Sequence, residues 1–147
     1  MRRLLLDTCA ILRLAAGVGV LSNRALTALE EATAVFVSPI SLWEIALKAR
    51  AGNLQLPNEP RVFFDDVVAY YGLEVLSLSL DVMSKSIDLP LFHRDPADRF
   101  IIATALLNNL VVVTTDHRFG QYGVEVLSYL SDGGVPAGRR TQGKERI

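Results

Sequence analysis

Cysteine and histidine are scarce in this sequence, with one cysteine and two histidines among 147 residues. Cys9 has no partner for an internal disulfide and belongs to no CxxC pair, so the sequence indicates neither an oxidising compartment nor a zinc site. We expect Cys9 to be a small buried apolar residue. His93 and His117 are too far apart to indicate a metal-binding pair, and we expect surface or hydrogen-bonded roles for both.

An excess of positive charge and a long apolar run are also missing. The formal net charge is −1, which is not typical of a general nucleic-acid binder, so any RNA contact must come from a local patch. No apolar run approaches the roughly 20 residues that are needed to span a bilayer. The apolar segment 4–6 that follows Met1, Arg2 and Arg3 is too short for a signal peptide. The sequence therefore predicts a cytoplasmic protein with no membrane segment.

Hydrophobic residues make up 50% of the chain and charged residues 21%, which is typical of a compact globular domain. Short runs rich in Val, Leu and Ile alternate with stretches of helical period. This pattern predicts an α/β fold, a three-layer α/β/α sandwich around a mostly parallel sheet of roughly five strands. The expected strands cover residues 4–6, 35–37, 73–76, 111–114 and 124–127. The expected helices cover residues 9–16, 23–32, 42–51, 61–71, 80–87 and 97–108.

A single domain is expected over residues 1–131, because no linker interrupts this part of the chain. The composition changes at Asp132, where a segment rich in glycine runs into basic residues. These are Arg139, Arg140, Lys144 and Arg146. With few apolar groups to bury, residues 132–147 are expected to form a disordered basic tail.

Four acidic residues lie at the ends or beginnings of expected elements, and each has a structural explanation. Asp7 and Asp116 follow strands and are suited to cap the turns after them. Glu44 closes the run Ser41-Leu42-Trp43-Glu44, which matches a helix capping box. Asp98 closes the run Asp95-Pro96-Ala97-Asp98, in a first helical turn where negative charge is favourable. Taken singly, the four acids indicate caps as readily as chemistry.

The joint position of these acids indicates a binding site. In an open parallel sheet, ligands bind beyond the carboxyl ends of the strands, and all four acids map to that edge if strand 4–6 is central. Carboxylates held close together repel one another unless they bind cations or protons. Their oxygens suit Mg²⁺ or Mn²⁺, which support phosphodiester cleavage. The residues alone leave two alternatives open: a metal-dependent phosphatase, and a non-catalytic binding module with the acids as helix caps.

Four sequence blocks surround the acids. They are Leu4-Leu5-Leu6-Asp7-Thr8, Ser41-Leu42-Trp43-Glu44-Ile45, His93-Arg94-Asp95-Pro96-Ala97-Asp98-Arg99-Phe100-Ile101-Ile102-Ala103-Thr104-Ala105 and Thr114-Thr115-Asp116. Together they resemble the PIN-domain family and, within it, the VapC-type ribonuclease toxins of toxin-antitoxin pairs. The third block is the most specific, because an H-x-D-P-x-D-R run before an apolar helix rarely arises by chance. The resemblance extends over residues 1–130.

This resemblance implies a PIN-like fold, cleavage of RNA, a divalent cation (Mg²⁺ or Mn²⁺), a homodimer, and inhibition by a bound antitoxin. The residues that it assigns to catalysis and metal binding are Asp7, Glu44, Asp98 and Asp116. Asp7 and Asp98 look like the principal ligands. Glu44 ranks last, because its capping box offers a sufficient explanation. Asp95 fits better as the cap of the helix that bears Asp98.

Several basic residues lie near the acids in sequence. They are Lys48, Arg50, Arg94, Arg99 and Arg118. Side chains of this kind grip phosphate groups, and solvated surface charge is the equally weighted alternative for each of them. Trp43, next to Glu44, is expected to pack in the core rather than to form part of a partner-binding groove.

Overall fold

The computed structural model describes residues 2–17 and 21–130 and contains one parallel sheet of five strands. The strands are β1 (Arg3–Leu6), β2 (Ala34–Val37), β3 (Glu74–Val75), β4 (Val111–Val113) and β5 (Val126–Leu127). Their order is β3-β2-β1-β4-β5, so β1 is the central strand, as its unbroken apolar run predicts.

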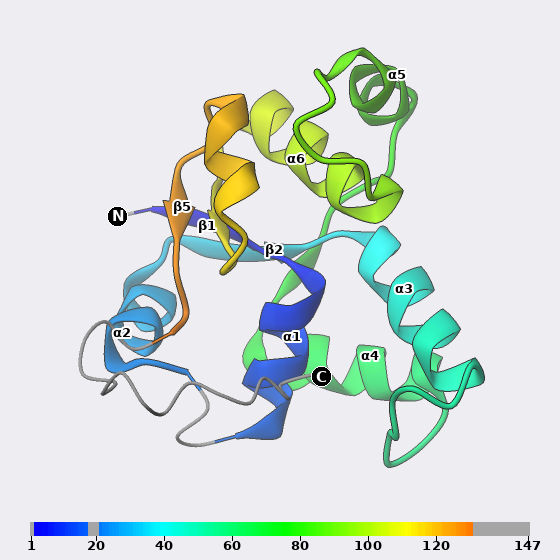
Figure 1. Cartoon of the computed structure of the whole chain (residues 1–147). Coiled ribbons are helices and arrows are strands. Elements are labelled where there is room, and N and C mark those ends of the chain that lie inside the picture. Colours follow the sequence, from blue (N-terminus) through cyan, green and yellow to red (C-terminus); the bar gives the residue numbers. More distant parts are fainter. Residues whose placement is uncertain (1, 18–20, 131–147) are drawn as a thin grey trace, which may run out of the picture.

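Helices cover both faces of this sheet. They are α1 (Thr8–Ala16), α2 (Asn23–Glu31), α3 (Pro39–Arg50), α4 (Pro60–Tyr71), α5 (Leu80–Asp88), α6 (Pro96–Asn108) and the 3₁₀ helix η1 (His117–Tyr122). Figure 1 shows α1, α2 and α4 on one side of the sheet and α5 and α6 on the other. The expected three-layer α/β architecture is confirmed.

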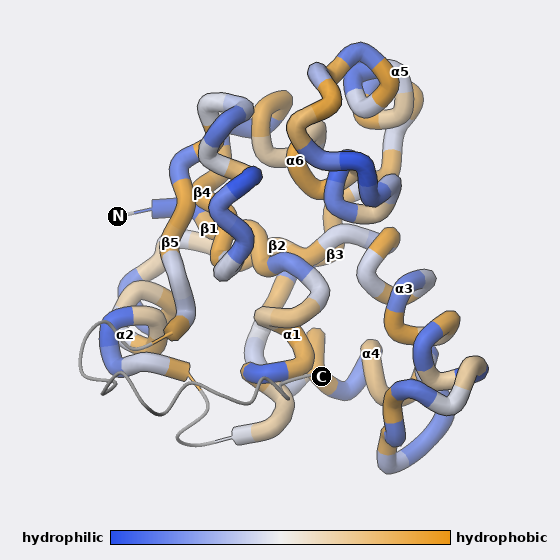
Figure 2. The backbone as a smooth tube through the Cα atoms, viewed as in Figure 1, coloured by the Kyte–Doolittle hydropathy of each residue, from blue (hydrophilic) through white to orange (hydrophobic). Residues whose placement is uncertain are grey.

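The central strand β1 feeds two separate hydrophobic cores, because successive side chains of a strand point to opposite faces. Leu4 and Leu6 pack in the core beneath α1, α2 and α4. Leu5 packs in the other core, with Ile101 and Ile102 of α6. Figure 2 shows hydrophobic residues along the central strands and also on the helices that flank them. Burial on both faces is what fixes the end of β1, and hence Asp7, in place.

Helix α3 begins at Pro39, earlier than the sequence predicts. Ser38 is its N-cap, with a side-chain oxygen that accepts from Ile40 N at 3.1 Å, and proline is favoured in a first helical turn. The capping-box interpretation of Ser41 and Glu44 is therefore wrong, since both residues lie inside the helix. Ser41 instead forms a hydrogen bond with the Thr8 hydroxyl at 2.9 Å, which joins the first turns of α3 and α1.

The other helices begin and end within a few residues of their expected positions. The expected domain end at residue 131 and the basic tail 132–147 lie outside the described residues, so both stay predictions. Among the described helices, none is both long enough and apolar enough to cross a membrane.

Candidate active site

Asp7 lies directly after β1, at the carboxyl edge of the sheet. Its Oδ1 accepts from Ala10 N at 2.7 Å and caps α1, so the predicted capping role is correct. Asp7 is 7% exposed. Burial raises the pKa of Asp7 to about 6, against opposing hydrogen bonds, and the charges of Glu44 and Asp116 add to the rise. The hydrogen bonds of Asp7 therefore do not fully offset the cost of burying its ionised carboxylate.

Asp98 lies in the first turn of α6, at the same edge. The cap of this helix is Asp95, whose side chain accepts from Asp98 N at 3.2 Å, as the sequence predicts. Burial raises the pKa of Asp98 well above its usual range, and the charges of Asp95, Glu44 and Asp7 raise it further. Because Asp95 already caps the helix, capping does not explain Asp98.

Glu44 lies on α3 with one carboxylate oxygen buried. In residues 2–17 and 21–130, its Oε1 has no hydrogen-bond partner. The charge of Glu44 contributes to the raised pKa of both Asp7 and Asp98, so these carboxylates lie within electrostatic reach of one another. A buried oxygen that lacks a donor is costly unless a cation or a proton meets it.

Asp116 caps η1 and differs from the other three acids in being well supplied with donors. Its Oδ1 accepts from the backbone N and Nε of Arg118 at 2.9 and 3.0 Å, and its Oδ2 accepts from Nη2 of Arg118 at 2.8 Å. Partial burial alone would raise its pKa, but the hydrogen bonds from Arg118 and His93 hold the pKa of Asp116 at about 2. Asp116 is therefore charged at neutral pH and already paired.

His93 is a member of this cluster that the sequence did not assign to it. It is 3% exposed, and its Nε2 lies 2.9 Å from Oδ2 of Asp98 and 2.9 Å from Oδ2 of Asp116. The ligand atoms of these three residues all lie within 4.8 Å of one another. The expectation of a hydrogen-bonded histidine is correct, and the H-x-D-P-x-D-R run was the available signal for its place beside the acids.

Arg99 is neither a phosphate-gripping nor a solvated cation, which corrects the prediction from sequence. The side chain is buried, and its guanidinium donates to four backbone carbonyls at distances between 2.7 and 3.0 Å. These carbonyls belong to Ser86, Leu89, Pro90 and His93. Arg99 thus ties the end of α5 and the loop 89–95 to α6, and it positions the loop that carries His93.

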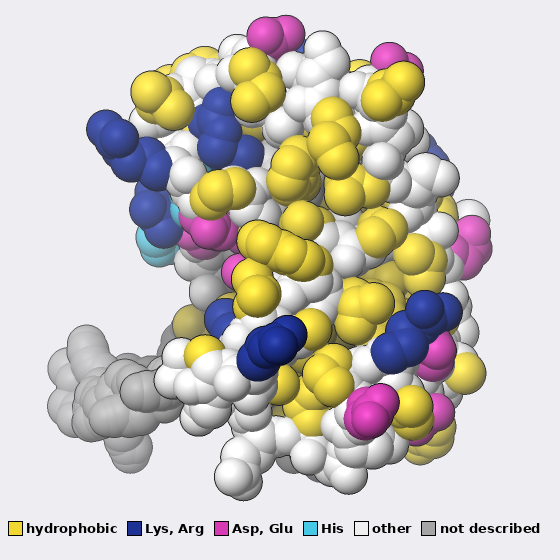
Figure 3. All heavy atoms as spheres, turned by 90° about the vertical axis from the view of Figure 1, so that its right-hand side faces the viewer, with side chains coloured by type: hydrophobic (Ala, Val, Ile, Leu, Met, Phe, Trp, Pro, Cys, Tyr) yellow, Lys and Arg dark blue, Asp and Glu magenta, His cyan; other side chains and the backbone are white. Residues whose placement is uncertain are grey.

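Trp43 is 53% exposed, so its expected place in the core is wrong. The buried residues Ile40, Ser41 and Ile45 define the inward face of α3. At 3.6 residues per turn, position 43 falls on the opposite face. Figure 3 shows the side of the molecule that carries α3 and α5, with many hydrophobic side chains at the surface.

The residues at this edge fit a hard divalent cation. Asp7, Glu44 and Asp98 are buried or half-buried, the charge of Glu44 raises the pKa of the other two carboxyls, and Oε1 of Glu44 has no hydrogen-bond donor among the described residues. Mg²⁺ and Mn²⁺ take oxygen ligands and neutralise such charge. Helix capping explains Asp7 and Asp116 but explains neither Glu44 nor Asp98.

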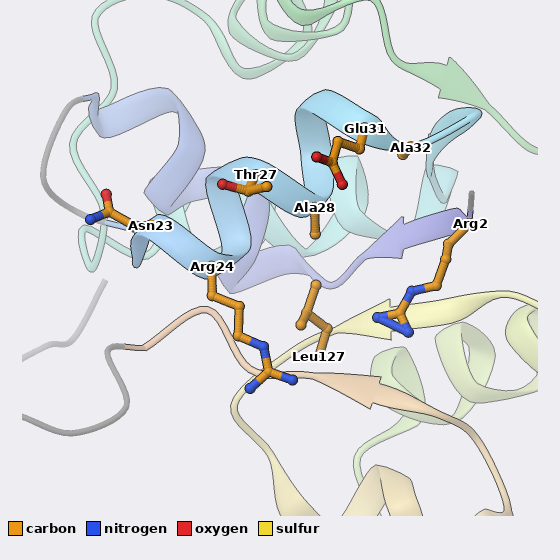
Figure 4. Close-up of a pocket in the computed structure, with 8 residues that line it drawn as sticks. All are labelled: Arg2, Asn23, Arg24, Thr27, Ala28, Glu31, Ala32 and Leu127. Atoms are coloured by element: carbon orange, nitrogen blue, oxygen red, sulfur yellow. The ribbon is translucent and has the colours of Figure 1, made fainter.

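A separate cavity of about 440 Å³ lies between α2 and β5 and contains none of the four acids. Figure 4 shows Arg2 and Arg24 approaching Leu127, which lies across from Ala28. Arg2 is paired with Glu125 at 2.7 Å, and Glu31 also lines the cavity. Its basic and acidic groups offset one another, so the acid-lined edge is the better candidate for the active site.

The raised pKa of Asp7 predicts a pH-dependent stability for the metal-free protein. A carboxyl whose folded pKa lies above its unfolded value stabilises the fold at low pH, and this contribution is lost as pH rises from about 4 through about 6. We therefore expect Asp7→Asn, which retains a capping side chain, to raise the melting temperature more at pH 7.5 than at pH 5. Differential scanning calorimetry in EDTA measures this difference. Asp65→Asn, on the exposed face of α4, is the control, and an equal effect of Asp7→Asn at both pH values would contradict the prediction.

Comparisons with known proteins agree with this fold. The model of the PIN domain family matches residues 4–125. No curated protein sequence is detectably similar to the chain. A chain of the DNA-bound VapBC complex from Salmonella typhimurium has a TM-score of 0.65 and 19% identity, over 88% of this chain and 100% of that one. A chain of FitAcB from Neisseria gonorrhoeae has a TM-score of 0.61 and 21% identity, over 84% and 95%. A chain of a toxin-antitoxin complex from Klebsiella pneumoniae has a TM-score of 0.61 and 21% identity, over 87% of this chain and 98% of that one.

Proposed function

This chain belongs to the PIN-domain family, and from that premise we propose that it is a metal-dependent endoribonuclease, the toxin of a toxin-antitoxin pair. The observation that carries the proposal is the carboxylate cluster at the edge of the sheet, where burial and mutual repulsion raise the pKa of Asp7 and Asp98. The orphaned oxygen of Glu44 supports it further. An edge of this kind is suited to a cation and a phosphate group.

In this proposal, Asp7, Glu44 and Asp98 hold Mg²⁺ or Mn²⁺, and Asp116 completes the catalytic set. When bound, the cation polarises the phosphodiester, helps to ionise a water and stabilises charge on the leaving oxygen. Glu44 is a stronger candidate metal ligand than the sequence indicated, because it does not cap a helix. Asp116 is a weaker candidate for direct metal binding, because both of its oxygens already accept hydrogen bonds from Arg118.

Basic side chains at the rim are proposed to hold the RNA backbone. Arg94 and Arg118 are exposed beside the acids, and Lys48 lies one helical turn after Glu44 on α3 and is half-buried. Arg118 already forms a bidentate pair with Asp116 at 2.8 to 3.0 Å, so it stands at the entrance to the cluster. Local cations of this kind offset the lack of an overall positive charge.

A protein partner is also part of the proposal. The structural relatives from Neisseria gonorrhoeae and Klebsiella pneumoniae are FitAcB and a toxin-antitoxin complex. From them we infer an antitoxin partner, and we also propose a homodimer and a cytoplasmic location for this chain. Exposed apolar side chains support such partners: Trp43 on α3 and Leu80 and Ile87 on α5 are each more than half exposed. A groove between α1 and α4, which includes Tyr70 and Tyr71, is similarly apolar.

The proposal predicts that the purified protein cleaves RNA only when Mg²⁺ or Mn²⁺ is present. Structured RNA and total RNA are incubated with the protein in Mg²⁺, in Mn²⁺ and in EDTA, and the products are separated by electrophoresis. Internal cuts that require the metal, together with a rise in melting temperature on metal addition, are the expected result.

The same assay separates the alternatives. Release of phosphate from small monoesters, with RNA left intact, would instead favour a phosphatase. A non-catalytic binding module would be favoured if the protein cleaves neither substrate and its melting temperature does not change when Mg²⁺ or Mn²⁺ is added. Sizing the protein in solution tests the homodimer independently.

A further inference from the structure

His93 is held on every polar atom that it has. Its backbone N–H donates to the Tyr122 hydroxyl at 2.8 Å, and its carbonyl accepts from Nη1 of Arg99 at 3.0 Å. Its ring packs edge-on against Phe119, with centroids 5.9 Å apart. Tyr122 and Arg99 also both donate to Pro90 O, at 2.6 and 2.8 Å. The loop 89–95 is therefore clamped from two sides, and the imidazole has little freedom to turn.

The ring nitrogens of His93 have different neighbours, which identifies the tautomer. Nδ1 accepts a hydrogen bond from the backbone N–H of Asp95 at 3.2 Å, so Nδ1 bears no proton. In the neutral ring the proton must then lie on Nε2. Nε2 is the atom that lies 2.9 Å from an oxygen of Asp98 and 2.9 Å from an oxygen of Asp116. The one N–H of the ring thus forms a hydrogen bond with Asp116, and an oxygen of Asp98 lies at the same distance from Nε2 beside it.

We propose that His93 is a positioning residue that donates from Nε2 to Asp116, lies in contact with Asp98, and is not itself a metal ligand. Two neighbouring carboxylates repel each other, and a donor that approaches both holds them in a fixed relation before any cation arrives. This inference rests on the proposed function only in that it assumes a cation at the acidic edge.

The competing possibility is that Nε2 coordinates the cation, since the three side chains are close enough to share one ion. Coordination through Nε2 would move the proton of a neutral ring to Nδ1. The Nδ1–H and the Asp95 N–H would then face each other as two donors, and the 3.2 Å hydrogen bond would be lost. The hardness of Mg²⁺, which favours oxygen ligands, argues in the same direction.

Two measurements on the unaltered full-length protein test this assignment. Nitrogen-15 NMR of the metal-free protein should show His93 with Nε2 protonated and Nδ1 unprotonated. With Mn²⁺ bound, pulsed electron paramagnetic resonance should show no nitrogen directly coordinated to the ion. A protonated Nδ1 in the neutral ring, or the coupling of a coordinated histidine nitrogen, would overturn the proposal.

A matched pair of variants tests the positioning effect. His93→Gln places an amide N–H near the position of Nε2, whereas His93→Asn retains a group near Nδ1 and loses the donor to the carboxylates. By calorimetric titration, Mn²⁺ should bind about 10- to 100-fold more weakly to His93→Asn, and His93→Gln should recover most of that loss. Circular dichroism checks that both variants remain folded.

Unchanged Mn²⁺ affinity in both variants would assign His93 a purely structural role, and a wild-type protein that binds no Mn²⁺ would also overturn the proposal. Failure of the ribonuclease proposal has a different signature, because the titration and the spectra contain no RNA. A protein that binds Mn²⁺ and shows the expected His93 tautomer, but cuts no RNA, would contradict only the proposed function.

Discussion

Asp98→Asn is expected to lower metal-dependent RNA cleavage by at least about 100-fold, since loss of a metal-binding carboxylate should cost no less than loss of a second-layer partner. The substitution removes a carboxyl whose ionised form is disfavoured by burial and by three neighbouring carboxylates, so the metal-free variant should melt at a higher temperature than the wild type. The stabilisation that Mg²⁺ or Mn²⁺ gives the wild type should disappear.

Asp95→Asn is the matched control for that experiment. It lies three residues earlier, it also removes one negative charge, and asparagine caps a helix about as well as aspartate. Its cleavage rate should remain within a few-fold of the wild-type rate. Full activity of Asp98→Asn, or equal losses in the two variants, would contradict the assignment of Asp98 as a metal ligand.

Arg99→Met is expected to cause the largest loss of stability, about 4 kcal/mol or more. Methionine fills part of the same volume but supplies no donors, and hydrogen bonds to a charged group each contribute about 1.5 to 3 kcal/mol. Four carbonyls would lose the Arg99 donor at once, and of these Pro90 O would keep the Tyr122 hydroxyl as a second donor. Urea denaturation followed by circular dichroism measures the change in unfolding free energy.

Arg61→Met provides the comparison for Arg99. Arg61 pairs with Asp65 at 3.0 Å on the exposed face of α4, and such surface pairs contribute about 0.5 kcal/mol or less. A small effect of Arg99→Met, close to that of Arg61→Met, would show that the four carbonyls find other donors.

The middle of the sheet was predictable from sequence because β4 and the Leu4–Leu6 part of β1 are buried on both faces and so appear as unbroken apolar runs. The Leu4–Leu6 run located the central strand correctly, and Asp7 at its end followed directly. The start of α3 was missed because Ser38 and Ser41 both match an N-cap. Only the position of Pro39 favours the first, and the Ser41 hydroxyl turned out to bind Thr8 in another helix. A partner so distant in sequence leaves no local pattern.

The candidate site was predictable in its acids but not in the residues that support them. Parallel-sheet topology places Asp7 and Asp98 at the same edge, whatever the details of packing. The roles of His93 and Arg99 depend on how the loop 89–95 folds back onto α6. The hydrophobic periodicity of the sequence does not predict such a contact. Trp43 was misplaced for a simpler reason: aromatic residues are buried on average, and only the turn-by-turn orientation of α3 exposes this one.

The hydrogen bonds that hold the loop 89–95 also indicate where substitutions would make the activity of this protein temperature-sensitive. Arg99 donates to carbonyls at the end of α5, in the loop and at His93. A displacement of α5 should therefore move the Arg99 side chain and, with it, the position of His93 at the acidic edge. Conservative changes in α5, such as Val82→Ala in the core beside α6, should therefore loosen the loop on warming while every acid is retained. Temperature-sensitive alleles of this chain are best sought there, away from the residues that meet the substrate.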